Sequence, residues 1–384
     1  MTAPNPQPFP FVAVSGTPYE RGVQYGKAVP ERVKRSIGLY GGTLDELGFT
    51  APEKARLIEQ FAREIAAFGA HYLEEMRGIA DGAGVSLDDI VLVNARTEIV
   101  AQARREKNRP EAEDDAVDGC TGAIILQERS STGRVIHGMN WDWRAECADT
   151  AIVLRVSRED GPDFLTFVEA GALARCGMNE AGIAITANYL ESERDYRQSG
   201  VPLVLIRRKV LEQRHFAMAV RAVAATPKAC SNNMMLSTAE GFGIDFECAP
   251  DEVFPIYPSD GMIVHANHWV SPVALAKLQD VGLLGDSFYR DWRVRKLLDK
   301  KSEEGGKVSP DDLKAAFFDD FAAPFAVCRP VLPNSAGDLS ATVAMIIMDT
   351  TGGTMDVAPL PAHCRDFTRY SLGQAPVSLV QAAE

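Results

Sequence analysis

The four residues DGCT (118–121) lie where the character of the chain changes. Before them runs a charged stretch, RREKNRPEAEDDAV (104–117), which is too polar to bury. After them come short apolar runs of the kind that form buried strands, beginning with TGAIILQ (121–127). We therefore expect an exposed loop up to the glycine and a strand that begins at Cys120.

A cysteine that follows glycine at the start of a strand can hold its thiol close to the preceding carbonyl group, because glycine permits unusual backbone conformations. If the turn is strained, the thiol of Cys120 can attack the carbonyl of Gly119, and hydrolysis then frees Cys120 as a new N-terminus. The reference pKa of an α-amine, about 8, is close to that of a thiol, about 8.5. The new amine would thus be a general base built into the nucleophile. The pattern by itself also fits an ordinary buried cysteine.

The remaining cysteines are widely spaced, and no C-x-x-C pattern occurs. They are Cys147, Cys176, Cys230, Cys248, Cys328 and Cys364. This spacing predicts neither a zinc site nor a disulfide framework, so we expect most of these cysteines to be small buried side chains.

The N-terminal third has a helical pattern. Thr17 is a good N-cap, and Glu20 completes a capping box three residues later. Helical periodicity covers residues 51–84 and stops at glycines, and Ser86 caps a helix that runs to Glu106 and allows a break.

Beyond Cys120, strands and helices come in groups. Strands are predicted between 121 and 190, including ALARCGMN (172–179), and are followed by two helices (203–226) and further strands (233–269). A helical zone (272–321), in which Ser309 is a predicted N-cap, and two strands around a Gly-rich turn (341–360) complete the chain. Grouping of this kind favours an α+β fold with helices layered on sheets.

Composition limits the possible functions. The chain has 384 residues, 46% hydrophobic, and a formal net charge of -13, which fits a soluble protein of one large domain or two ordinary ones. An acidic chain argues against nucleic acid or an anionic membrane as the main partner. The first residues lack the pattern of a signal peptide, and no run is long enough to span a membrane, so we expect a cytoplasmic location.

Several chemical classes lack their motifs. There is no phosphate-binding glycine loop and no G-x-S-x-G elbow. Among the six histidines, only His265 and His268 are close in sequence, and residues three apart on a strand face opposite sides. We expect no metal site and no cofactor.

Several blocks in a shared order resemble the acyl-coenzyme A:isopenicillin N acyltransferase (6-aminopenicillanic acid acyltransferase) family of self-processing Cys N-terminal nucleophile hydrolases. The blocks are SGTPYERGVQYG (15–26), EEMRGIADGAGVSLDDIVLVNARTE (74–98), DGCT (118–121), GMNWDW (138–143), EAGALARCGMNEAGIAITANY (169–189), VHANH (264–268) and PFAVCRP (324–330). The bile salt and penicillin V hydrolases are similar in the hairpin and N-x-D blocks.

The resemblance implies a four-layer αββα sandwich and autocatalytic cleavage between Gly119 and Cys120. Residues 1–119 would form a mostly helical α chain and residues 120–384 the catalytic β chain, which stay together as one globular heterodimer. Cys120 would be the nucleophile that forms a thioester. Asp142 would orient or charge the α-amine of Cys120, and Asn267 would be the oxyanion-hole residue.

The same resemblance suggests four substrate-binding residues, and each has a plainer alternative. Asn188 and Tyr189 match pocket positions of the bile salt hydrolases, Arg329 lies in the Cys-Arg block, and Trp143 is a candidate for the acyl pocket. Arg329 also fits a structural ion pair, and Trp143 an ordinary core aromatic. Asp142 also fits a hydrogen-bonded polar side chain at the end of a strand, and Asn267 fits a turn residue that bonds to its own backbone.

The main functional hypothesis is a self-processed enzyme that acts on a small-molecule N-acyl amide or acyl thioester. Met139 stands where the bile salt hydrolases carry an arginine, and Asp338 and Leu339 stand where fungal members of the acyltransferase family carry a Ser-Arg pair. The missing arginine favours hydrolysis of a small N-acyl amide over transfer. The alternatives are an acyl-CoA-dependent N-acyltransferase, an unprocessed binding or structural relative, and a papain-like hydrolase in which Cys120 needs a separate imidazole. Further homo-oligomers remain open.

Overall fold

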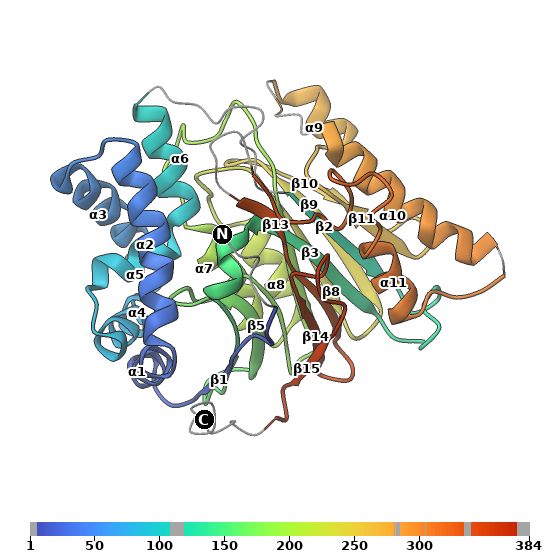
Figure 1. Ribbon diagram of the computed structural model, residues 1–384, viewed down its shortest axis with the longest axis horizontal. Coiled ribbons are helices and arrows are strands. Elements are labelled where there is room, and N and C mark those ends of the chain that lie inside the picture. Colours follow the sequence, from blue (N-terminus) through green and yellow to red (C-terminus); the bar gives the residue numbers. More distant parts are fainter. Residues whose placement is uncertain are drawn as a thin grey trace.

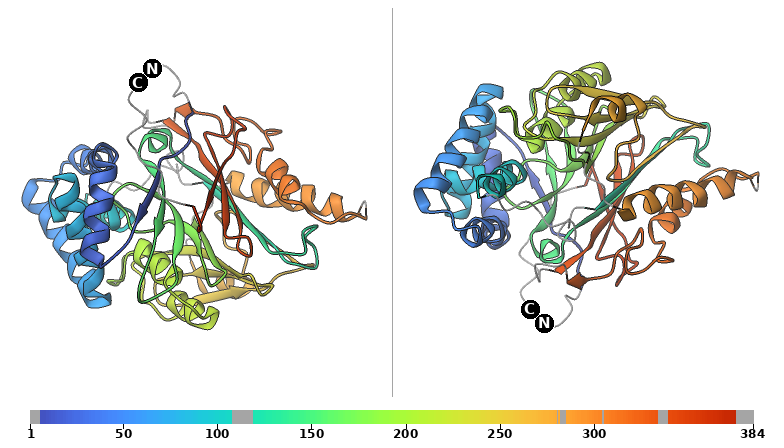
Figure 2. Two further views of the ribbon diagram at one scale, coloured as in Figure 1. Left: turned by 90° about the horizontal axis from the view of Figure 1, so that it is seen from below. Right: turned by 90° about the horizontal axis from the view of Figure 1, so that it is seen from above.

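Two stacked β-sheets lie between two layers of helices in the computed structural model, which describes residues 6–107, 119–279, 281, 285–303, 305–333 and 339–374. Figure 1 shows the helices of residues 18–106 on one side, the helices that follow residue 272 on the other, and the strands between them. The two further views in Figure 2 keep this order of layers. The predicted α+β, four-layer αββα sandwich is therefore confirmed.

The two sheets are built largely from the segment after Cys120. The first is ordered β1 (Phe11–Val14), β4 (Ala151–Val156), β5 (Phe164–Glu169), β6 (Cys176–Asn179), β7 (Ile183–Tyr189), β8 (Asn232–Thr238), β9 (Phe242–Cys248) and β10 (Val253–Ile256). The second is ordered β11 (Met262–His265), β2 (Cys120–Ile125), β3 (Ile136–Arg144), β13 (Leu339–Asp349), β14 (Thr354–Pro359) and β15 (Thr368–Ser371), with β12 (Leu332–Pro333) paired to β13. Strand β1 runs parallel to β4, so the segment before the glycine also contributes to a sheet.

The helices cover the outer faces of the sheets. The first sheet carries α1 (Pro18–Ala28), α2 (Pro30–Glu46), α3 (Ala51–Phe68), α4 (Ala70–Ala83), α5 (Leu87–Asn94), α6 (Arg96–Glu106), α7 (Leu203–Leu211) and α8 (Phe216–Ala224). The second carries α10 (Gly285–Glu303) and α11 (Pro310–Phe317), with α9 (Pro272–Lys277) and a short 3-10 helix (Ala145–Asp149) elsewhere. Among the described helices, none has both the length and the apolar character needed to cross a membrane.

Alternation along the strands explains the layers, because successive side chains point to opposite faces. On β4, Ile152 and Leu154 pack under the N-terminal helices, whereas Val153 faces the space between the sheets. On β2, Ile125 packs outward with Val294 of α10, whereas Cys120 belongs to the cluster between the sheets. The strand register thus turns the thiol of Cys120 into the interior of the sandwich.

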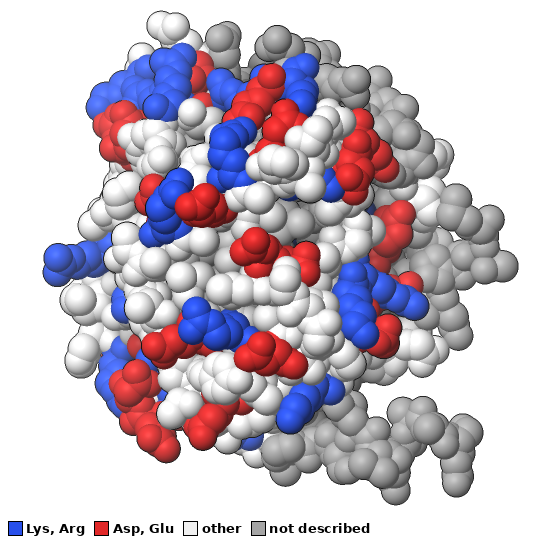
Figure 3. Space-filling view, turned by 90° about the vertical axis from the view of Figure 1, so that its left-hand side faces the viewer, with Lys and Arg blue, Asp and Glu red and all other residues white. Residues whose placement is uncertain are grey.

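The surface of the N-terminal helical layer is charged without a dominant sign. Figure 3 shows basic and acidic side chains interspersed on this face. In this layer, Arg63 pairs with Glu59 at 2.7 Å on α3, and Arg56 pairs with Glu106 of α6 at 2.5 Å. Such exposed pairs contribute little to stability, about 0–1 kcal/mol each.

Several local predictions are confirmed. Thr17 and Glu20 form the predicted capping box of α1. The helix expected from Ser86 breaks at Ala95 into α5 and α6. Ser309 caps α11 in a further box with Asp312.

Two expectations about element boundaries were wrong, and one segment lies outside the described residues. Strand β6 begins at Cys176, so residues 172–175 form a loop in place of the predicted start of a strand. Residues 104–106 of the predicted charged loop belong to α6, and residues 108–118 lie outside the described part of the chain. The C-terminal strand β15 was not predicted.

Candidate active site

Cys120 opens β2 and is fully buried between the sheets. Its backbone N–H donates a hydrogen bond of 2.7 Å to Oδ1 of Asn267. Its Sγ lies 3.8 Å from Nη2 of Arg175, in the loop before β6. The nucleophile predicted from the sequence is thus held by an amide on one side and faces a cation on the other.

The carbonyl group of Gly119 is held from the other side of the same peptide bond. Its oxygen accepts a hydrogen bond of 2.9 Å from the backbone N–H of Asp142 on β3. A Cβ atom at residue 119 would lie 2.9 Å from Cζ of Arg329, closer than real Cβ atoms come to other atoms. A larger residue at position 119 would therefore have to displace this guanidinium.

Arg329 keeps its position through carboxylates. Its Nε lies 3.4 Å from Oδ2 of Asp142, and its Nη2 pairs with Asp286 at the start of α10. Burial raises the pKa of the Asp142 carboxyl, while Arg329, Arg290 and a 2.6 Å hydrogen bond from Oγ1 of Thr342 oppose that rise. Asp142 and Arg329 thus both lie beside Gly119, whereas the catalytic role of Asp142 and the substrate-binding role of Arg329 stay predictions.

Asn267 has a fixed orientation, because both ends of its carboxamide are used. Oδ1 accepts from Cys120 N–H and from Nη2 of Arg290 at 2.9 Å, and Nδ2 donates to the carbonyl oxygen of Tyr189 at 3.0 Å. Its backbone N–H donates to Oγ of Ser287 at 2.6 Å. In the uncleaved chain, therefore, the oxygen of Asn267 faces Cys120, and the predicted oxyanion role stays a prediction.

Arg290 is a site residue that sequence reasoning missed. It lies fully buried on α10, and its Nη1 donates to the carbonyl oxygen of Cys120 at 2.7 Å and to Oγ1 of Thr121 at 3.0 Å. Its Nε pairs with Asp286 at 3.1 Å, one helical turn earlier. The sequence shows only one arginine among several on a charged helix, so nothing local marks it as buried.

A narrow cavity near Cys120 is lined by Arg175, whose Nη2 lies 3.8 Å from Sγ of Cys120, and by three of the four predicted substrate-binding residues. Its lining is Arg96, Thr97, Trp143, Arg175, Ala187, Asn188, Tyr189, Leu203, Arg207 and Asn232. In the uncleaved chain its free volume is about 20 Å³, roughly enough for one or two water molecules. Arg329, the fourth predicted residue, does not line it. A substrate role for Trp143, Asn188 and Tyr189 stays a prediction.

The two neighbouring histidines have other tasks. Nε2 of His265 lies 2.8 Å from Oε1 of Glu247, and Nδ1 lies 2.9 Å from the carbonyl oxygen of Ala266. Nδ1 of His268 lies 2.8 Å from Oγ of Ser287, and burial lowers the pKa of His268 to about 4. Because both nitrogens of His265 are used, this ring is not the free imidazole that a papain-like site requires.

The described ranges contain no group of three or more His, Cys, Asp or Glu side chains arranged to hold a metal ion.

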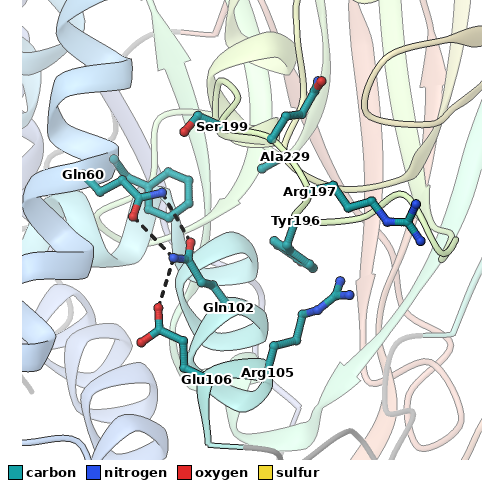
Figure 4. Close-up of a pocket in the computed structure, with 10 residues that line it drawn as sticks. Gln60, Gln102, Arg105, Glu106, Tyr196, Arg197, Ser199 and Ala229 are labelled. Carbon is teal, nitrogen blue, oxygen red and sulfur yellow. Dashed lines mark hydrogen bonds between the residues drawn. The ribbon is translucent and has the colours of Figure 1, made fainter.

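A second, larger cavity lies apart from Cys120. The cavity, of about 470 Å³, lies between α3, α6 and residues 196–199 (Figure 4). There Gln102 hydrogen-bonds to both Gln60 and Glu106. This cavity shares no lining residue with the one near Cys120.

Comparison with known proteins agrees with this geometry. The sequence model of the acyl-coenzyme A:6-aminopenicillanic acid acyl-transferase family matches residues 129–358. The chain belongs to this family. It is 29% identical over 334 residues to the 40 kDa form of acyl-coenzyme A:6-aminopenicillanic-acid-acyltransferase from Emericella nidulans, covering 83% of this chain and 84% of that protein. An uncharacterized protein of Archaeoglobus fulgidus is 27% identical over 189 residues, 45% of this chain and 31% of its own.

Solved structures support the fold assignment. A mutant form of conjugated bile acid hydrolase from Clostridium perfringens is similar with a TM-score of 0.50 and 13% identity, over 66% of this chain and 92% of that one. At this identity the likeness concerns the fold, and it agrees with the predicted N-terminal nucleophile hydrolase sandwich.

Proposed function

We propose that this family member cleaves its own chain between Gly119 and Cys120 and then acts as a cysteine amidohydrolase on a small N-acyl amide. The observation that carries the proposal is that the peptide bond between Gly119 and Cys120 is hydrogen-bonded at both its oxygen and its nitrogen. The carbonyl oxygen of Gly119 accepts from Asp142 N–H, and the nitrogen of Cys120 donates to Asn267. Both ends of the bond that would break are thus held by residues of the predicted site.

Self-cleavage follows from these contacts. The Sγ of Cys120 attacks the carbonyl carbon of Gly119, and negative charge develops on the oxygen that the N–H of Asp142 already contacts. The C–N bond breaks, the nitrogen of Cys120 takes up a proton, and Gly119 is left as a thioester. Water then hydrolyses the thioester to the Gly119 carboxylate and the free thiol, with the guanidinium of Arg329 beside the new anion.

The same groups serve the catalytic cycle. The freed α-amine of Cys120 keeps its acceptor, Oδ1 of Asn267, and takes the thiol proton as Sγ attacks the substrate carbonyl. The nearby carboxylate of Asp142 stabilises the resulting ammonium. Nδ2 of Asn267 carries two hydrogens and uses one for Tyr189, so the second meets the requirement of an oxyanion donor. The ammonium then protonates the leaving amine, and water releases the acid from the acyl-Cys120 thioester.

A second candidate is acyl transfer. The fungal relative is named as an acyltransferase that uses acyl-coenzyme A and 6-aminopenicillanic acid, and it matches most of both chains. In this case an amine, in place of water, would attack the thioester of Cys120.

A single assay separates the candidates. The purified protein is incubated with short- and medium-chain N-acyl anilides, with and without a primary amine, and both products and the Cys120 peptide are followed by mass spectrometry. Hydrolysis predicts an acyl adduct on Cys120 and free acid at a rate that the amine leaves unchanged. An N-acylated amine as the main product would favour transfer. A cleaved chain that forms no adduct with any substrate would contradict the amidohydrolase proposal.

A further inference from the structure

Arg175 presents a positive charge directly at the nucleophile. Its guanidinium stacks over the indole ring of Trp141, with Cζ 4.2 Å from the ring centroid, and its Nη2 lies 3.8 Å from Sγ of Cys120. The side chain is about nine-tenths buried and lines the narrow cavity. Stacking on a ring leaves the hydrogen-bonding edges of a guanidinium available to a ligand in its plane.

Among the described residues, no carboxylate balances the charge of Arg175. In the described part of the chain, no carboxylate lies within ion-pair distance of it, and its buried Nε has no hydrogen-bond partner. Arg329 and Arg290, by contrast, both pair with Asp286. A buried guanidinium without an anion is costly unless some other anion compensates for it.

The cavity adds to the positive potential. Arg96 and Arg207 also line it, and none of its lining residues is acidic. Arg96 is paired with Glu169, and Arg207 lies near the buried Glu98 carboxyl, whose pKa burial raises and the charge of Arg207 lowers. No such carboxylate accompanies Arg175 among the described residues, so Arg175 carries the excess charge. The small free volume fits a flat, compact anion better than a bulky ring.

We propose that Arg175 binds a carboxylate of the substrate, so that the enzyme acts on acyl amides that carry a carboxylate a few bonds from the scissile carbonyl. This inference rests on the proposed function for its substrate side, whereas the anion subsite itself is a property of the cavity. A carboxylate on the Nε–Nη2 edge would make two parallel charged hydrogen bonds, each about 2.7–2.9 Å long. It would then lie close to Sγ of Cys120, and the substrate would be oriented for attack.

The first experiment needs no substrate. Cys120 is alkylated with iodoacetate and with the isosteric iodoacetamide, and the rates are read from the Cys120 peptide by mass spectrometry. An effect of Arg175 on thiol reactivity changes both rates alike, so their ratio isolates recognition of the carboxylate. Cys364, which is partly exposed, is the internal reference.

The expected result is a higher ratio of iodoacetate to iodoacetamide rates at Cys120 than at Cys364. Arg175→Gln should lower the ratio at Cys120 by about 10- to 100-fold, the loss of one or two charged hydrogen bonds. Arg175→Lys should give an intermediate ratio, since lysine keeps the positive charge but cannot donate two parallel hydrogen bonds to one carboxylate. The control Arg197→Gln, at an exposed arginine, should leave the ratio at Cys120 unchanged. Equal ratios at the two cysteines, or an unchanged ratio in both Arg175 variants, would overturn the inference.

The second experiment locates the carboxylate on the substrate. One matched pair carries it on the acyl side, as an N-succinyl anilide against its succinamide analogue, and the other on the amine side, as an N-acyl amino acid against its amide. The pair that matches the site should lose its preference for the acid in Arg175→Gln. If the alkylation ratio behaves as expected while no acyl amide is turned over, the subsite stands and the proposed function fails. Turnover with no preference for acids in either pair would leave the function and overturn the subsite.

Discussion

At the scale of single residues, the peptide bond between Gly119 and Cys120 is the centre of the account. Its oxygen and its nitrogen each have a partner within 2.9 Å, and those partners come from β3 and from the segment after β11. On the third side, the guanidinium of Arg329 occupies the space that a Cβ atom at residue 119 would need, since its Cζ would lie 2.9 Å from that atom. Small changes at this bond should therefore affect cleavage before they affect the fold.

Gly119→Ala should slow self-cleavage. The new Cβ would meet the Arg329 guanidinium, which its pairs with Asp142 and Asp286 hold in place. We expect the precursor fraction, measured by denaturing gel electrophoresis over time, to persist at least several times longer than in the natural chain. Gly38→Ala in α2, where a Cβ meets nothing within 4 Å, is the control. Cleavage of Gly119→Ala at the natural rate would show that the glycine is not needed there.

Asp142 should impose an acid limit on turnover. Burial raises the pKa of its carboxyl above the ordinary 3.8, so the proton that neutralises the carboxylate binds at a higher pH than usual. Turnover that needs the carboxylate should therefore be present above that raised pKa and fall as the pH drops through it. Asp142→Asn should lose most of its acyl-amide turnover, and the turnover that remains should not fall at acid pH in this way.

The control for this change is Asp149→Asn, whose exposed carboxyl pairs with Arg35 at 3.4 Å on the surface. Rates of acyl-amide turnover between pH 3 and 8 are measured for both variants, with thermal unfolding alongside. A profile of Asp142→Asn that matches the natural one in rate and shape would contradict the assigned role.

At the scale of elements, a buried ion pair joins the two sheets. His265 is on β11 of the second sheet, and Glu247 is on β9 of the first. Glu247 also accepts from the backbone N–H groups of Val270 and Ser271. Although burial opposes it, the charges of Asp245 and Glu247 raise the pKa of His265 to about 9. The pair of protonated His265 and ionised Glu247 therefore stabilises the sandwich.

Stability should fall in mildly alkaline solution for this reason. Since the folded chain holds the His265 proton more tightly than the unfolded chain, this contribution is complete below pH 6.5 and is lost as the pH rises through about 9. His265→Gln should be less stable at pH 6, and its free energy of unfolding should decline less between pH 6.5 and 9. Urea unfolding at a series of pH values measures both. Identical slopes for the two proteins would contradict the assignment of the charge.

The elements also show what the sequence could predict. Thr17, Ser86 and Ser309 act locally, so their capping boxes were readable from neighbouring residues. The start of β2 at Cys120 was readable from the change in composition. Arg290 and Arg175 were not, because their importance arises from contacts across the fold that no local pattern encodes.

For the whole molecule, the two predicted chains share one core. Side chains of α1 to α6 pack in a single cluster with strands β4, β5, β7 and β8, and β1 pairs with β4. Burial of apolar surface on this scale favours continued association after a single cleavage. The division at residue 119 would then be a covalent boundary within one folded unit.

The fragments should consequently co-elute. Size-exclusion chromatography of the cleaved protein in dilute buffer should give one peak that contains both chains, and only denaturant should separate them. Mixing experiments with a tagged α chain would report exchange, which should be slow. Separation of the chains in native buffer would contradict a shared core.

The measurement that tests the central claim most directly is the intact mass of the purified protein, with N-terminal sequencing, beside Cys120→Ala. The account predicts two chains, one of which begins at Cys120, and a variant that stays whole. A single uncleaved chain in both samples would remove the α-amine base. It would contradict the proposed nucleophile and favour a binding relative that keeps the sandwich without the chemistry.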